Sequence, residues 1–154
     1  MSLEEFLKWI HVLAAIAWVG GSFALVILVV RASVTSDAGL LKGLIRQSDF
    51  FGRFVFNIAG ILVLVAGIWL VIESPVWDWD QAFISIGFAG VAVGIVLGMG
   101  FYPRQWEKVD TALEDGGIES SGVGTALATL RNVAAAEIAV LVVVVWAMVT
   151  KPGL

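Results

Sequence analysis

The sequence contains no cysteine and only one histidine among its 154 residues. Without cysteine there is no disulfide framework, no thiolate metal site and no cysteine-bound iron–sulfur cluster. One histidine is too few for a three-imidazole zinc or copper site, or for a haem held by two imidazoles of one chain. Charge is also scarce, at 14% Asp, Glu, Lys and Arg, and the net charge of −4 argues against nucleic acid as a partner.

Apolar residues, in contrast, make up 60% of the chain and are concentrated in four stretches, at about residues 6–30, 54–72, 82–102 and 132–149. A helix rising ~1.5 Å per residue needs about 20 apolar residues to cross a hydrocarbon layer of about 30 Å. A lone strand in lipid would leave its backbone groups unpaired, whereas a helix satisfies its own. We therefore predict an all-α fold, a four-helix antiparallel transmembrane bundle that forms one integral membrane domain over residues 1–154.

Positive charge is unevenly distributed among the predicted loops. Seven of the nine Lys and Arg residues lie in or at the ends of the first and third loops, and the second loop, residues 73–81, has none. Because cytoplasmic loops are enriched in Lys and Arg, we expect both termini to face outward from the cytoplasmic membrane. Apolar residues recur at helical spacing in both inner loops, which predicts amphipathic segments, the first a short helix lying among the lipid headgroups.

Glycines follow one face of the third apolar stretch, at Gly87, Gly90, Gly94 and Gly98. Small residues at this spacing let the backbones of neighbouring helices approach closely. We interpret the groove as a helix-packing face inside one bundle. The alternative is that a flat cofactor or a second copy of the chain lies against it.

Ionisable residues at membrane depth are costly and commonly functional, which draws attention to Glu137 in the last stretch. Arg53 and Asn57 enter the second stretch from the same inner side. We predict an intramembrane polar cluster of Arg53, Asn57 and Glu137, in which a buried ion pair sets the helix register. Proton transfer or substrate binding is the alternative.

The single histidine, His11, lies about one and a half turns below the outer start of the first stretch. At helical spacing it shares a face with small residues and one large ring, namely Ala14, Ala15, Trp18 and Ser22. Such a face can admit a ligand, and Met148 in the last stretch lies at a suitable depth to add a thioether. The alternative is a histidine hydrogen-bonded to a neighbouring carbonyl.

The segment WIHVL at residues 9–13, followed by WVGG at residues 18–21, resembles the first helix of the copper-resistance D (CopD)-like superfamily. In that helix a histidine is followed seven residues later by tryptophan and paired small residues. GIW at residues 67–69 and PR at residues 103–104 are similar to a family of small, uncharacterised integral membrane proteins within that superfamily. The resemblance implies copper handling, with His11 as the metal ligand, although three methionines and one histidine are few for a copper relay.

A more distant resemblance is to HemJ-type protoporphyrinogen oxidase, also a four-helix membrane protein with a histidine in its first helix. RN at residues 131–132 and KPG at residues 151–153 are similar to the ends of that family's last helix. This resemblance implies that His11 ligates haem. That family places a lysine four residues after a tryptophan, whereas here Trp77 is followed by Gln81, which argues against porphyrinogen oxidation.

These observations lead us to expect a small membrane subunit, not independently catalytic, that binds haem b or a related flat cofactor near its outer side. The cofactor-binding residues would be His11 and Trp18, together with Met148 or the histidine of a second chain in a homodimer. One alternative is a cofactor-free assembly or scaffold subunit of a larger membrane complex. The other is copper handling. No hydrolase or nucleotide-binding motif is present, since the Gly-rich segments lie within predicted membrane helices.

Overall fold

The computed structural model describes residues 2–153, except for the side chain of Arg53. Within this range the chain is helical and has no strand, which confirms the all-α prediction. The helices, two of them short π-helical segments (η), are α1 (Leu3–Val34), α2 (Ala38–Phe50), η1 (Phe51–Phe56), α3 (Asn57–Glu73), α4 (Ala82–Ile95), η2 (Val96–Phe101), α5 (Tyr102–Gly116) and α6 (Ser121–Thr150). Because η1 joins α2 to α3 and η2 joins α4 to α5 without a break, the chain forms four long rods.

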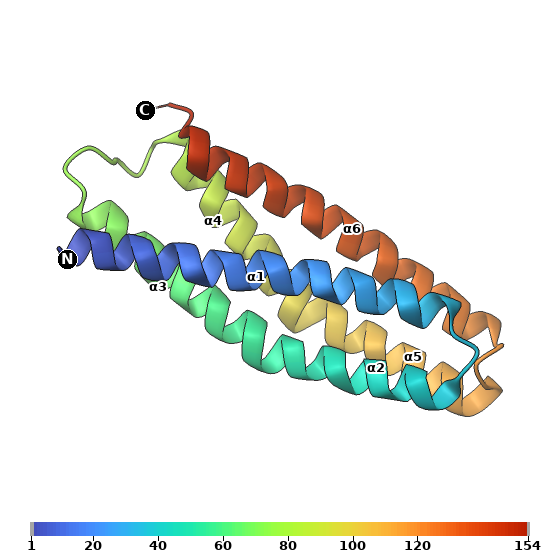
Figure 1. Cartoon of the computed structure of the whole chain (residues 1–154). Coiled ribbons are helices and arrows are strands. Elements are labelled where there is room, and N and C mark those ends of the chain that lie inside the picture. Colours follow the sequence, from blue (N-terminus) through green and yellow to red (C-terminus); the bar gives the residue numbers. More distant parts are fainter. Residues whose placement is uncertain (1, 154) are drawn as a thin grey trace.

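The four rods run antiparallel and side by side (Figure 1). Each is long and apolar enough to cross a membrane, so the predicted four-helix transmembrane bundle is confirmed. Both chain termini lie at the same end of the bundle as the connection at residues 74–81 (Figure 1), and we call this the terminal end. The turns at residues 35–37 and 117–120 lie at the opposite, distal end.

The amphipathic segments are helical, and they continue the spans directly instead of forming separate short elements. α2 runs directly into η1 and α3, and α5 follows directly from α4 and η2. Their apolar sides are buried against protein: Leu41 of α2 and Val109 of α5 are both 0% exposed. An amphipathic stripe can be covered by lipid or by other helices, and here the ends of α1 and α6 cover it.

The rods are longer than a membrane requires. α1 alone has 32 residues, which corresponds to ~48 Å of helix against about 30 Å of hydrocarbon. The distal parts of the rods carry charged residues such as Lys42, Arg46 and Glu107, so we expect these parts to extend beyond the hydrocarbon. We call this part, made of α2, α5 and the adjoining ends of α1 and α6, the distal platform.

The largest group of buried side chains lies in and next to the distal platform. This distal core consists of Leu25, Val29, Ala32, Leu41, Leu44, Tyr102, Trp106, Val109, Leu113, Val123, Ala126, Leu127, Leu130 and Ala134. Two smaller groups lie nearer the terminal end, one around Trp18 and the other around Phe83. Elsewhere in the spans most apolar side chains point outward, as expected for helices that contact lipid.

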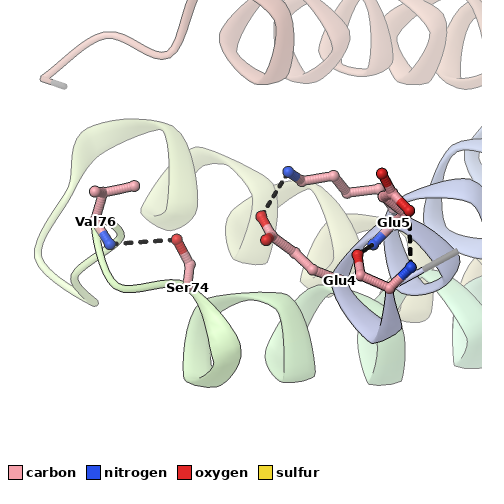
Figure 2. Close-up of polar contacts among 6 residues, drawn as sticks. Glu4, Glu5, Ser74 and Val76 are labelled. Atoms are coloured by element: carbon pink, nitrogen blue, oxygen red, sulfur yellow. Dashed lines mark hydrogen bonds and ion pairs between the residues drawn. The ribbon is translucent and has the colours of Figure 1, made fainter.

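The start of α1, at the terminal end, is capped by polar side chains. Glu5 donates its backbone N–H to Ser2 Oγ over 3.2 Å, and its carboxylate accepts the Ser2 N–H over 2.7 Å. Lys8 forms an ion pair with Glu4, with Nζ 2.6 Å from Oε1. Figure 2 shows these contacts at the start of α1, beside the bend after α3 where the Val76 N–H donates to Ser74 Oγ. The capping box satisfies backbone N–H groups that a helix start would otherwise leave unpaired.

Candidate functional site

Large side chains inside the spans lie against glycines of neighbouring helices, and we call each such glycine a seat. Trp18 of α1 reaches between two of them, Gly60 of α3 and Gly94 of α4. A Cβ atom added at Gly60 would lie 3.5 Å from Trp18 Cζ3. One added at Gly94 would lie 2.8 Å from Cη2, and closer still to Cζ2. The indole therefore occupies the space that the two missing side chains leave.

The other glycines of the third rod receive side chains of α6. Val144 lies at Gly90, where an added Cβ would be 2.5 Å from Cγ2, and Met148 lies at Gly87, where an added Cβ would overlap Cε. Gly98 differs, since an added Cβ there would meet no described atom within 4 Å. The structure thus places α6 against Gly87 and Gly90, which leaves no open groove at those positions.

His11 is held between α1 and α3. Its Nδ1 lies 3.0 Å from the carbonyl oxygen of Val63, and its ring packs on Gly67, where an added Cβ would be 3.1 Å from Cε1. A carbonyl can only accept, so Nδ1 carries the proton and Nε2 keeps a lone pair. Gly67 follows Val63 by one helical turn, and its missing side chain gives the imidazole access to that carbonyl.

The three residues predicted to bind a cofactor have different neighbours in the structure. His11 contacts α3, Trp18 reaches between α3 and α4, and Met148 contacts α4 from α6. A surface groove of about 420 Å³ between α1 and the α3 rod includes none of them. Its lining is entirely apolar: Trp9, Ile10, Leu13, Ala14, Ala17, Phe54, Val55, Ile58, Ala59 and Leu62.

The polar cluster also differs from the prediction. Tyr102 donates its hydroxyl hydrogen to the Glu137 carboxylate, and the Ser22 hydroxyl of α1 faces the same carboxylate. Asn57 is instead exposed on the surface of α3. The side chain of Arg53, the other predicted partner, lies outside the described residues. Glu137 therefore pairs with a phenol that the sequence analysis did not consider.

A π-helical turn explains why Tyr102 reaches Glu137. In an uninterrupted α-helix, positions seven apart return to nearly the same face. η2 takes up one extra residue, so the eight-residue step from Gly94 to Tyr102 also returns to the interior face. Two signals pointed to Tyr102: it is the only tyrosine of the chain, and a buried phenol needs a hydrogen-bond partner.

Comparison with known proteins places the chain among membrane proteins without assigning it an activity. No curated protein and no solved structure is similar to it at a significant level. One family model, described as predicted integral membrane protein (DUF2269), matches residues 5–152 and so covers nearly all of the four rods. With four candidate spans along the matched region, the chain belongs to this family of integral membrane proteins.

Proposed function

We propose that the chain is a cofactor-free assembly subunit of a larger membrane complex, and that its distal platform is the part that binds the partner. The observation that carries this proposal is the position of the distal core. Its side chains include Leu41, Val109 and Leu130, all 0% exposed, in a region that the rods do not need for crossing the membrane. A well-packed extension of this kind supplies a rigid protein surface beside the bilayer.

The outer surface of the platform is suited to contact with a protein. Exposed Arg46 on α2 and exposed Glu107 on α5 add charges of both signs, and Lys42 lies 3.8 Å from Glu114 across the two helices. The excess of Lys and Arg in this half supports a cytoplasmic position for the platform, with both termini outside. The partner would then be a cytoplasmic domain or loop.

The packing of the spans supports a role without a cofactor. Two of the three residues predicted to bind a cofactor, Trp18 and Met148, fill glycine seats of their own chain. His11 is engaged with Val63 and Gly67. Each of these side chains therefore has a packing role that requires no foreign group.

Site-specific photo-crosslinking in living cells tests the platform. A photoreactive residue at Arg46 or Glu107 is expected to give a discrete protein adduct. The matched control is Ile61 of α3, whose side chain is 62% exposed on the lipid-facing surface and should yield lipid adducts. Protein adducts from Ile61 but from neither platform position would contradict the proposal.

A second candidate, haem or copper ligation by His11, is supported by the hydrogen bond of its imidazole. Ligating histidines usually donate one ring N–H to a carbonyl or carboxylate, which leaves the other nitrogen for the metal. The Nδ1 contact with Val63 has this form and leaves Nε2 as the ligating atom. His11 would hold the metal through Nε2, and bound haem would supply one-electron chemistry.

An absorption spectrum of protein purified from haem-replete cells separates the two candidates. We expect no Soret band, and we expect His11→Ala to lower the free energy of unfolding by about 1 kcal/mol through loss of the Val63 hydrogen bond. The measurement is reversible unfolding in detergent, with exposed Asn57→Ala as the control. A Soret band in the wild type that His11→Ala removes would favour the haem candidate, and equilibrium binding of Cu(I) lost in the same variant would favour copper.

A further inference from the structure

We propose that Glu137, Tyr102 and Ser22 form a proton-binding site inside the bundle, in which the Glu137 carboxylate takes up one hydrogen ion. The three side chains come from α6, α5 and α1, and they are 7%, 8% and 3% exposed. Glu137 lies near the middle of α6 and Tyr102 is the first residue of α5, so the site lies where the spans join the distal platform. Ionisable groups buried inside a membrane bundle are rare and commonly belong to ion or proton pathways. This site is separate from His11 and from the outer surface of the distal platform.

The state of Ser22 is the second observation. Its Oγ is buried, and in the described part of the chain it has no partner in good hydrogen-bond geometry, although it faces Glu137. A hydroxyl can rotate to donate or to accept. It can therefore donate to an ionised carboxylate, and it can accept from a carboxylic acid. Tyr102 donates to one oxygen of Glu137, and in the proposal it keeps this bond when the other oxygen is protonated.

Proton uptake by Glu137 needs only hydronium and these three side chains. An O–H bond forms on a Glu137 oxygen and one O–H bond of hydronium breaks, which leaves water. The carboxyl changes from a charge of −1 to neutral, and Tyr102 and Ser22 keep their own hydrogens. The new O–H then points to Ser22 Oγ, so each state of the carboxyl has hydrogen-bond partners.

The surroundings favour a hydrogen ion over a larger cation. The three side chains offer four oxygens, fewer than the six or more ligands of Ca²⁺ or Mg²⁺, and the described residues contain no group of three His, Cys, Asp or Glu side chains that could hold a metal. From α1 the group that faces Glu137 is Ser22, and from α5 it is Tyr102; neither carries a charge. Arg131, on the same helix as Glu137, is exposed. Among the side chains that the structure describes, which do not include that of Arg53, none places a cation beside this carboxylate. A buried carboxylate in such surroundings is costly, and proton uptake removes its charge.

Infrared spectroscopy of the protein in lipid nanodiscs, recorded across a pH series, tests the site. We expect a carbonyl band of a protonated carboxylic acid that grows as the pH is lowered and is absent in Glu137→Gln. The control is Glu119→Gln, at an exposed position in the turn before α6, which should keep the band. Tyr102→Phe and Ser22→Ala should each shift the frequency and the pH midpoint of the band, because each removes one hydrogen-bond partner.

If Glu137→Gln folds, either of two results would overturn the proposal. One is an identical pH series for the wild type and Glu137→Gln, since the titrating acid would then lie elsewhere. The other is loss of the band on addition of Na⁺ at constant pH, which would assign the site to a metal cation. If Glu137→Gln fails to fold, the proposal is tested by the band shifts in Tyr102→Phe and Ser22→Ala. A carboxylic acid band that is unshifted in both variants would overturn the proposal.

Discussion

Gly94→Leu is expected to lower the free energy of unfolding of the bundle by about 3 kcal/mol or more. The new side chain would have to enter the space held by Trp18, whose Cη2 lies 2.8 Å from the position of an added Cβ atom. The indole cannot retreat freely, because its other edge lies against Gly60. Overpacking a well-filled core costs about 1–3 kcal/mol and sometimes more, and leucine adds further atoms to the clash. Reversible unfolding in mixed detergent micelles, followed by circular dichroism, measures the loss.

Gly98→Leu is the matched control, since an added Cβ at Gly98 meets no described atom within 4 Å. Its effect should stay within about 1 kcal/mol, because a helical glycine is itself destabilising relative to other residues. The double variant Trp18→Ala with Gly94→Leu should recover part of the stability lost in Gly94→Leu. Equal losses of unfolding free energy in Gly94→Leu and Gly98→Leu would show that the contact between Trp18 and Gly94 does not cause the destabilisation.

Trp106→Ala is expected to unfold the distal platform while the spans stay inserted. The indole is 7% exposed in the distal core, and removing a buried tryptophan costs about 3–5 kcal/mol. The spans have their own contacts around Trp18 and Phe83, so the opening should be local. Hydrogen–deuterium exchange should show loss of protection in α2 and α5, with α3 and α4 little changed.

Trp146→Ala is the control for this second experiment. Trp146 is 54% exposed on α6 and faces lipid near the terminal end, so its removal should leave the exchange pattern of α2 and α5 unchanged. If Trp106→Ala instead increases exchange evenly along all four rods, the platform and the spans unfold as one unit. The platform would then not be a separately packed part of the molecule.

Much of the fold could be predicted from the sequence, because few backbone structures can span a membrane. Apolar length sets the number of helices, and the hydrogen-bonding needs of the backbone exclude strands. That the amphipathic segments continue the spans could not be predicted, since an apolar stripe such as that of Leu41 and Leu44 does not reveal whether lipid or protein covers it. The deciding factor was the length of α1 and α6, which extend far enough to cover α2 and α5.

The candidate sites were harder to predict, because depth in the membrane is easier to estimate than rotation about a helix axis. The sequence predicts similar depths in the membrane for Glu137 and Asn57, yet the Asn57 side chain is exposed on the surface of α3. Tyr102 faces Glu137 only because η2 adds a residue to the turn before it, and π-helical turns have no reliable sequence signature. For His11, the glycine one turn after Val63 was a usable signal for the carbonyl contact.

The unbroken passage from α3 into α2, and from α4 into α5, has a mechanical consequence. Each junction runs through a π-helical segment, η1 or η2, and no loop interrupts either rod. A force applied at one end of such a rod is therefore carried along helix to the other end. Under the proposed function, a partner bound at the distal platform would act on the opposite end of the bundle through these same helices.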